Sequence, residues 1–236
     1  MRLKSALYCL FPATFFLLPG AGSATICGDA YYNHTINWPR TSDLYFTVAG
    51  APASTCGDLY VSRNGSAYQK TAGWICTDGA GTATKGPWTY ASQTGDETAY
   101  GYIDWGTCIS PTVEHIWDVS NPTATISSSA PSNFYGSASD NTWGAGFDSS
   151  WTFCYGEYAD VTSPTTTWWN GSGYSGTSQT LWTITCSGMP SHSISWSTTS
   201  AQRPALSDHQ SGHHYVWTVW IWDGGHWGTA STSFWY

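Results

Sequence analysis

Charged side chains are scarce in this sequence, and positive ones are the scarcest. Only 9% of the 236 residues are charged, with seven Lys plus Arg against fifteen Asp plus Glu. Two of the seven basic residues lie in the first four positions, so five remain in the rest of the chain, which carries a net charge near −10. Such a chain does not attract phosphate backbones, so the composition disfavours binding to nucleic acid.

Helical periodicity and long apolar runs are also missing. No stretch repeats apolar residues at helical spacing for more than about two turns. Beyond the N-terminus, no segment approaches the roughly 20 apolar residues that a membrane-spanning helix needs. We therefore expect an all-β protein without a membrane span once its N-terminus has been removed.

Known catalytic motifs are absent as well. The sequence has no Gly-x-Ser-x-Gly nucleophile elbow and no glycine-rich loop with the lysine that binds phosphate. Only three Glu occur, and no spacing selects a pair of carboxylates for glycoside hydrolysis. The prediction is a non-catalytic protein, with a secreted hydrolase of unrecognised site as an alternative.

The N-terminus is typical of an export signal. Two basic residues within the first four positions precede an apolar stretch over 7–18, and small residues follow. This order predicts a signal peptide over residues 1–24, cut after Ser23 or Ala24. The mature protein is then secreted or held on the cell surface.

Cysteine usage agrees with export. Six cysteines remain after the signal, and an even number in an exported chain predicts disulfides. They are Cys27, Cys56, Cys76, Cys108, Cys154 and Cys186. If the two halves fold separately, Cys154 must pair with Cys186, whereas the first half allows three connectivities. A zinc site of four cysteines is disfavoured because no Cys-x₂-Cys pair occurs.

Aromatic residues are in excess, with 16 Trp and 15 Tyr, and they alternate with other residues as in strands. Leu44, Phe46 and Val48 share one face of a predicted strand. A second set, Tyr215, Trp217, Val219 and Ile221, shares one face, with Trp220 and Trp222 on the other. The Gly-Gly pair at 224–225 and renewed alternation over 229–235 predict a long hairpin.

Short strands at intervals of about 8–12 residues, separated by Gly, Ser, Asn and Pro, indicate β-sandwiches. Pro122 cannot donate to a strand ladder, so it favours a boundary near 118–122. We therefore predict an N-terminal β-sandwich domain over 25–118 and a second domain over 122–236.

Four segments of the second half resemble bacterial immunoglobulin-like domains, the modules of adhesins and large secreted proteins. The segments are Pro-Thr-Ala-Thr-Ile-Ser at 122–127, 135–141 with Gly-Ala-Gly at 144–146, Thr-Trp-Trp-Asn-Gly-Ser at 167–172, and 215–234 around Trp-Asp-Gly-Gly-His-Trp-Gly. The chain departs from the family in its Trp excess and in His226, where Asn is common. The resemblance implies tandem immunoglobulin-like sandwiches and a bacterial protein of cell adhesion or interaction. Residues 25–118 resemble no specific family, and we extend the same fold class to them.

Sixteen Trp exceed the roughly two or three that each sandwich can bury. Exposed aromatic rows stack on sugar rings or pack on another protein. We expect an adhesion, surface or interaction module that contacts an extracellular protein or polysaccharide. The alternative is a carbohydrate-binding protein whose platform consists of Trp168, Trp169, Trp220 and Trp222. Cross-strand stacking that only stiffens the sheet is a further interpretation.

Oxygen-bearing residues collect near the predicted domain junction. They are Asp118, Asn121, Asp140 and Asp223. Calcium binds roughly six to eight such oxygens, and the resemblance adds that tandem adhesin domains often hold a junction ion. A calcium site here is therefore one hypothesis, and the favoured interpretation is that these Asp and Asn residues cap turns.

The histidines suggest a second metal hypothesis. His209, His213 and His214 lie close together after Asp208, and His226 lies across the predicted hairpin. A His-x₃-His spacing binds zinc on a helix, but here it precedes a strand. A solvated loop is therefore the favoured interpretation.

Overall fold

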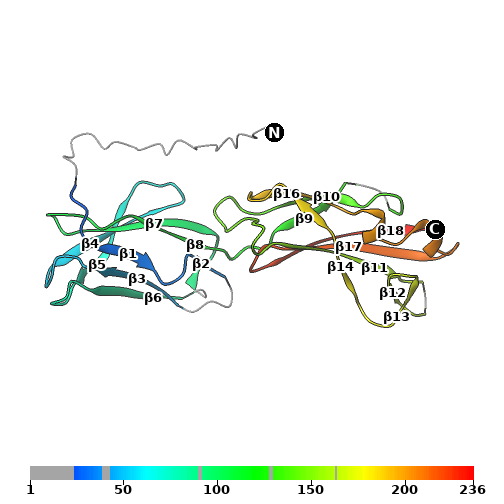
Figure 1. Cartoon of the computed structure of the whole chain (residues 1–236), viewed down its shortest axis with the longest axis horizontal. Helices are drawn as coiled ribbons and strands as arrows, with labels where there is room; N and C mark the ends of the chain where they lie inside the picture. Colours follow the sequence, from blue (N-terminus) through cyan, green and yellow to red (C-terminus); the bar gives the residue numbers. More distant parts are fainter. Residues whose placement is uncertain (1–23, 39–42, 90–91, 128–129, 163) are drawn as a thin grey trace, which may run out of the picture.

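The computed structural model describes residues 24–38, 43–89, 92–127, 130–162 and 164–236. Figure 1 shows two lobes that lie end to end, one from each half of the chain. The regular elements of the described residues are strands, apart from short 3₁₀ turns at Ser200–Gln202 and Leu206–Asp208. The all-β fold with two tandem sandwiches is confirmed. The predicted signal peptide, residues 1–24, lies outside the described residues except for Ala24.

The N-terminal lobe consists of two facing sheets. One has the order β1 (Asp29–Tyr32), β3 (Leu44–Ala49), β6 (Ala83–Trp88). The other has the order β2 (Ile36–Asn37), β8 (Val113–Trp117), β7 (Glu97–Asp104), β4 (Cys56–Arg63), β5 (Gln69–Cys76). Phe46 and Val48 from the first sheet pack with Leu59 and Ile103 from the second, so alternation along each strand builds one core.

The C-terminal lobe repeats this plan with larger sheets. A four-stranded sheet has the order β15 (Thr185–Ser187), β16 (Ser193–Ser197), β10 (Tyr135–Ser139), β9 (Thr123–Ile126). The facing sheet has the order β13 (Tyr174–Gly176), β12 (Thr167–Trp169), β11 (Phe153–Asp160), β17 (His214–Trp222), β18 (Trp227–Trp235), and β14 (Leu181–Thr183) also pairs with β11. Trp196 and Trp217 each contact Phe134 between the sheets, in a core rich in aromatic rings.

The long hairpin at the C-terminus is confirmed. β17 and β18 pair in register from His214 opposite Trp235 to Trp222 opposite Trp227. The inward residues of β17 are fully buried, while Trp220 and Trp222 lie on the outer face. The period of two in the sequence therefore sets which side chains fill the core and which remain outside.

Three disulfides join the six cysteines. Cys154 on β11 bonds Cys186 on β15 and so links the two sheets of the C-terminal lobe. The N-terminal lobe adopts one of its three possible connectivities, Cys27–Cys108 and Cys56–Cys76. Three disulfides fit an extracellular protein, because reducing compartments do not maintain them. In the described part of the chain, no helix has the length and apolar character needed to cross a membrane.

One histidine of the N-terminal core is completely buried. The ring of His115 packs between Tyr32 and Trp117, and its Nδ1 lies 2.8 Å from the carbonyl oxygen of His34. Burial lowers the pKa of His115 to about 4, because the protonated ring would lose its hydration. The folded protein therefore holds this ring neutral over a range in which the unfolded chain takes up a proton.

We predict that this residue contributes a specific acid sensitivity. The free energy of unfolding should fall as pH drops from about 6.5 towards 4, since only the unfolded chain gains the proton, and the loss should reach roughly 2 kcal/mol at pH 4.5. Urea denaturation at pH 7 and pH 4.5 measures it. His115→Leu should remove this share of the pH dependence, and equal losses in both proteins would contradict the prediction.

Candidate functional site

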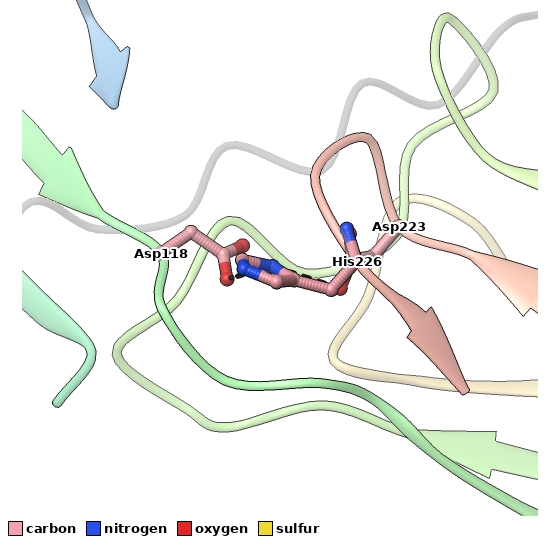
Figure 2. Close-up of side chains that lie close together, drawn as sticks. All are labelled: Asp118, Asp223 and His226. Carbon is pink, nitrogen blue, oxygen red and sulfur yellow. Dashed lines mark hydrogen bonds and ion pairs between the residues drawn. The ribbon is translucent and has the colours of Figure 1, made fainter. Parts of the chain in front are cut away.

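The loops between the two lobes bring four aspartates and one histidine together. Asp96 precedes β7, Asp118 follows β8, Asp140 follows β10, and the β17–β18 turn supplies Asp223 and His226. In Figure 2, Asp118 reaches from the linker towards Asp223 and His226, which lie in the turn. Asp118 and Asp223 have no exposed surface, and His226 is 9% exposed. We call these five residues the junction cluster.

Backbone amides hold two of its carboxylates across the linker. Asp96 Oδ1 accepts hydrogen bonds from the amides of Val119 and Ser120, at 2.7 and 2.8 Å. Asp118 Oδ2 accepts one from the amide of Ala145 at 3.0 Å. The Asp96 bonds join the N-terminal lobe to the linker, and the Asp118 bond joins the start of the linker to a loop of the C-terminal lobe.

The other carboxylates shape local loops. Asp223 Oδ1 accepts hydrogen bonds from the amides of Gly225 and His226, at 2.8 and 2.6 Å, and closes the hairpin turn. Asp140 Oδ2 accepts one from Gly146 at 3.0 Å. These hydrogen bonds fix the turn that carries the imidazole of His226.

Ligand atoms of three residues converge at the centre of the cluster. His226 Nδ1 lies 3.3 Å from Asp118 Oδ1 and 3.9 Å from Asp223 Oδ2. One ligand atom from each residue lies within 4.8 Å of the others. This is a buried set of two carboxylate oxygens and one imidazole nitrogen, a combination that can hold a metal ion or share a proton.

Burial and mutual repulsion disturb the titration of the cluster. Burial, and next the charge of Asp118, raise the pKa of Asp140 to about 6. Burial also raises the pKa of Asp223, although its turn amides oppose the shift. Burial alone would lower the pKa of His226, but the carboxylates of Asp118 and Asp223 outweigh it and raise that pKa. The cluster thus contains more negative charge than its surroundings neutralise.

Trp38 of the N-terminal lobe covers the β17–β18 turn. Its ring packs against Trp151 with 5.7 Å between centroids and lies over the glycines of the β17–β18 turn. A Cβ added at Gly225 would lie 2.5 Å from Cδ1 of Trp38. The two glycines therefore allow an indole from one lobe to seal the turn of the other.

Three residues of the predicted calcium set, Asp118, Asp140 and Asp223, do come together. Asn121 is exposed, and no described contact brings it to the cluster. Asp96 was missed, because nothing in the sequence before β7 links it to a loop that follows β8. The calcium site itself stays a hypothesis.

The other histidines lie elsewhere. His209 packs on Tyr215, His213 pairs with Asp160 at 2.7 Å, and His214 stacks on Trp235. Each has its own neighbour, and among the described residues these three do not converge on a metal position. His226 is separated from them by the length of β17, roughly 27 Å for nine residues.

The predicted tryptophans divide between two environments. Trp169 is only 5% exposed and belongs to the core, so it offers no ring to a ligand. Trp168 and Trp220 lie on the outer face of the large sheet. Their indole Nε1 atoms donate hydrogen bonds to Oε1 and Oε2 of Glu157, at 3.2 and 2.7 Å. A single carboxylate thereby fixes both rings.

Further rings extend this face towards the junction. We define the aromatic platform as Phe153, Tyr155, Trp220, Trp222 and Trp227. Phe153 stacks near Tyr155, and Trp227 contacts Tyr155, Trp220 and Trp222 with centroids 4.9 to 6.1 Å apart. Phe153 is 51% exposed and Trp227 is 37% exposed. The platform is a connected set of rings on the outer face of the sheet, in which Phe153 and Trp227 are exposed and the other three are half-buried.

The N-terminal lobe contains a cavity of about 280 Å³ between its sheets. Its lining includes one carboxylate, that of Glu97, which pairs with Arg63 at 3.3 Å. A glycosidase needs two carboxylates across its cleft. This cavity therefore lacks the pair of acids that hydrolysis of a glycoside requires.

Comparisons with known proteins give only distant likenesses. No family of known proteins matches the chain, and no curated protein matches it. A tetra-tandem repeat from the extending region of a large adhesion protein matches with 10% identity and a TM-score of 0.32, over 88% of this chain and 48% of the other. A two-domain fibronectin type III segment of chicken tenascin matches with 11% identity and a TM-score of 0.26, over 89% and 99%. The chain spans about half the length of the adhesion repeat structure, and at these TM-scores the likenesses carry no functional argument.

The contact between Trp38 and the hairpin turn leads to a stability prediction. Gly225→Ala should lower the free energy of unfolding by about 1–3 kcal/mol, because the new Cβ overpacks the indole. Gly79→Ala is the matched control, since a Cβ there has no atom within 4 Å. Thermal and urea denaturation compare the two. A Gly225→Ala protein as stable as the control would show that Trp38 is not fixed on the turn.

Proposed function

We propose that this chain is a secreted or surface-held, non-catalytic adhesion protein whose C-terminal lobe binds an extracellular polysaccharide. The observation that carries the proposal is the aromatic platform on the outer face of the large sheet. Aromatic rings on a firm sheet offer flat apolar faces, and the C–H faces of sugar rings stack on such surfaces.

The surroundings of the platform favour a neutral sugar over a charged partner. Along β17 and β18 the outer positions beyond the rings are mostly hydroxyl-bearing, and Thr218 and Ser231 hydrogen-bond at 2.8 Å. The carboxylate of Glu157 already accepts from two indoles. A face of rings and hydroxyls gives stacking and neutral hydrogen bonds, whereas protein interfaces are enriched in arginine as well as aromatic residues.

The platform is also held in place before binding. Glu157 accepts hydrogen bonds from the indoles of Trp220 and of the neighbouring Trp168. Trp227 packs against Trp222 with 4.9 Å between ring centroids. Fixed rings lose little conformational freedom when a ligand arrives, so more of the stacking energy contributes to affinity. This supports a role in binding, beyond stiffening the sheet.

Single alanine variants test the polysaccharide proposal. Trp220→Ala and Phe153→Ala should each weaken binding about tenfold, since a stacked ring contributes on the order of 1 kcal/mol or more. Trp74→Ala is the control, because Trp74 is 68% exposed on the other lobe. A glycan array identifies the ligand, and pull-down on insoluble polysaccharides followed by titration measures the affinity.

Circular dichroism must show that each variant keeps its strands. Loss of polysaccharide binding in both platform variants, with the control unchanged, supports the proposal. Retained binding in the folded platform variants would contradict it. If the chain binds no polysaccharide but binds a purified extracellular protein through the platform, its partner is a protein and not a polysaccharide.

A further inference from the structure

We propose that Asp118, Asp223 and His226 form a binding site for a divalent first-row transition metal of the Zn²⁺ class, which ties the two lobes together. This site lies outside the aromatic platform and does not rest on the polysaccharide proposal. The three residues come from two segments far apart in the sequence, the linker after β8 and the β17–β18 turn. A metal bound there would cross-link the segments directly (Figure 2).

Unused carboxylate oxygens point to a ligand. Asp96, Asp118 and Asp223 each use one oxygen to accept backbone hydrogen bonds. The second oxygen of each, Asp96 Oδ2, Asp118 Oδ1 and Asp223 Oδ2, is buried and has no hydrogen bond of normal geometry with the described residues, although Asp118 Oδ1 and Asp223 Oδ2 lie within ion-pair distance of His226 Nδ1. Buried carboxylate oxygens are costly to leave unsatisfied, so their partner must be a cation or a shared proton.

The charge balance also favours a cation. The junction cluster holds four carboxylates against a single imidazole. The ion pairs of lysine and arginine in the described residues involve Glu97 and Asp58, neither of which belongs to the cluster. Even a protonated His226 would leave several negative charges in a buried position, and a divalent ion supplies the missing charge where it is needed.

The donor atoms select the class of metal. Calcium prefers six to eight oxygens at roughly 2.3–2.6 Å, whereas imidazole nitrogen suits zinc and its neighbours. With bonds of about 2.0–2.1 Å, the ligand atoms of a tetrahedral zinc lie about 3.3 Å apart. His226 Nδ1 and Asp118 Oδ1 are 3.3 Å apart, and Asp223 Oδ2 lies 3.9 Å from the same nitrogen. Small side-chain movements would bring all three ligand atoms to the spacing of a tetrahedral site, and a water molecule can take the fourth position.

Substitution of His226 by asparagine separates the two metal classes. In His226→Asn, the amide oxygen can replace Nδ1 as an oxygen ligand, so a calcium site would survive or improve. A zinc site would lose its nitrogen ligand, and we expect its affinity to fall roughly 100-fold. Asp223→Asn should weaken zinc binding by a similar factor. His213→Asn is the matched control, because His213 also faces a carboxylate, that of Asp160.

The experiment uses the mature protein, stripped with chelator and titrated calorimetrically with ZnCl₂ and separately with CaCl₂. We expect one Zn²⁺ per chain, binding more tightly than Ca²⁺, and a higher melting temperature with zinc. His226→Asn and Asp223→Asn should lose both effects, and His213→Asn should keep them. No zinc binding by the folded wild-type protein would overturn the proposal in favour of a shared proton. Calcium binding that survives His226→Asn would overturn the choice of metal class.

A second readout avoids dependence on the folding of the variants. Imidazole ¹⁵N chemical shifts of the wild-type protein report which ring nitrogen binds metal. Zinc should shift Nδ1 of His226 and leave the ring of His213 unchanged. Zinc that shifts His213 or His214 in place of His226 would place the ion at the other end of the hairpin and contradict the proposal. These measurements involve no polysaccharide, so their failure is distinct from failure of the proposed function.

Discussion

The burial of carboxylates between the lobes is the constraint on which the arrangement of this molecule depends. Asp118 and Asp223 are removed from water, and a buried carboxylate is stable only when each oxygen has a partner. One oxygen of each is satisfied by backbone amides of a loop, which fixes that loop. The other oxygens face the imidazole of His226, where the linker and the hairpin turn approach each other. The polar junction thus specifies a geometry that apolar packing alone would leave loose.

Packing against this junction is equally specific. Trp38 lies over a turn that has glycine at both central positions, so an indole from one lobe reaches the backbone of the other. Thr98 of the N-terminal lobe also donates a hydrogen bond to the carbonyl of Trp143, at 3.0 Å. The contacts between the lobes therefore combine charged, aromatic and backbone interactions. Contacts of these three kinds restrict bending more than a simple linker would.

The sequence predicted those features that depend on local periodicity. Alternation along 215–222 assigned Trp217 to the core and Trp220 to the outer face, and the structure agrees because a strand turns successive side chains to opposite sides. The cysteine count identified the bond from Cys154 to Cys186, since two halves with separate cores leave no other pairing.

Features that depend on long-range contact were not accessible in the same way. The pair Trp168 and Trp169 was known to face opposite sides, but the sequence alone does not say which ring meets the second sheet. Asp96 lies in the loop before β7, and it reaches the junction cluster because β7 and β8 are neighbours in the sheet. His226 was grouped with the histidines near the start of the hairpin, although the length of β17 carries it to the far end. In each case the missing information was tertiary.

One element contributes to both proposed sites. The β17–β18 hairpin ends in the turn of Asp223 and His226, and its outer face supplies Trp220, Trp222 and Trp227 to the platform. Trp222 and Trp227 directly flank that turn and pair across the ladder. The platform is therefore joined to the junction along a hydrogen-bonded ladder, and there Asp118 approaches His226 from the linker. Because a fixed junction fixes the hairpin, the direction in which the platform faces is set by the same buried charges that hold the lobes together.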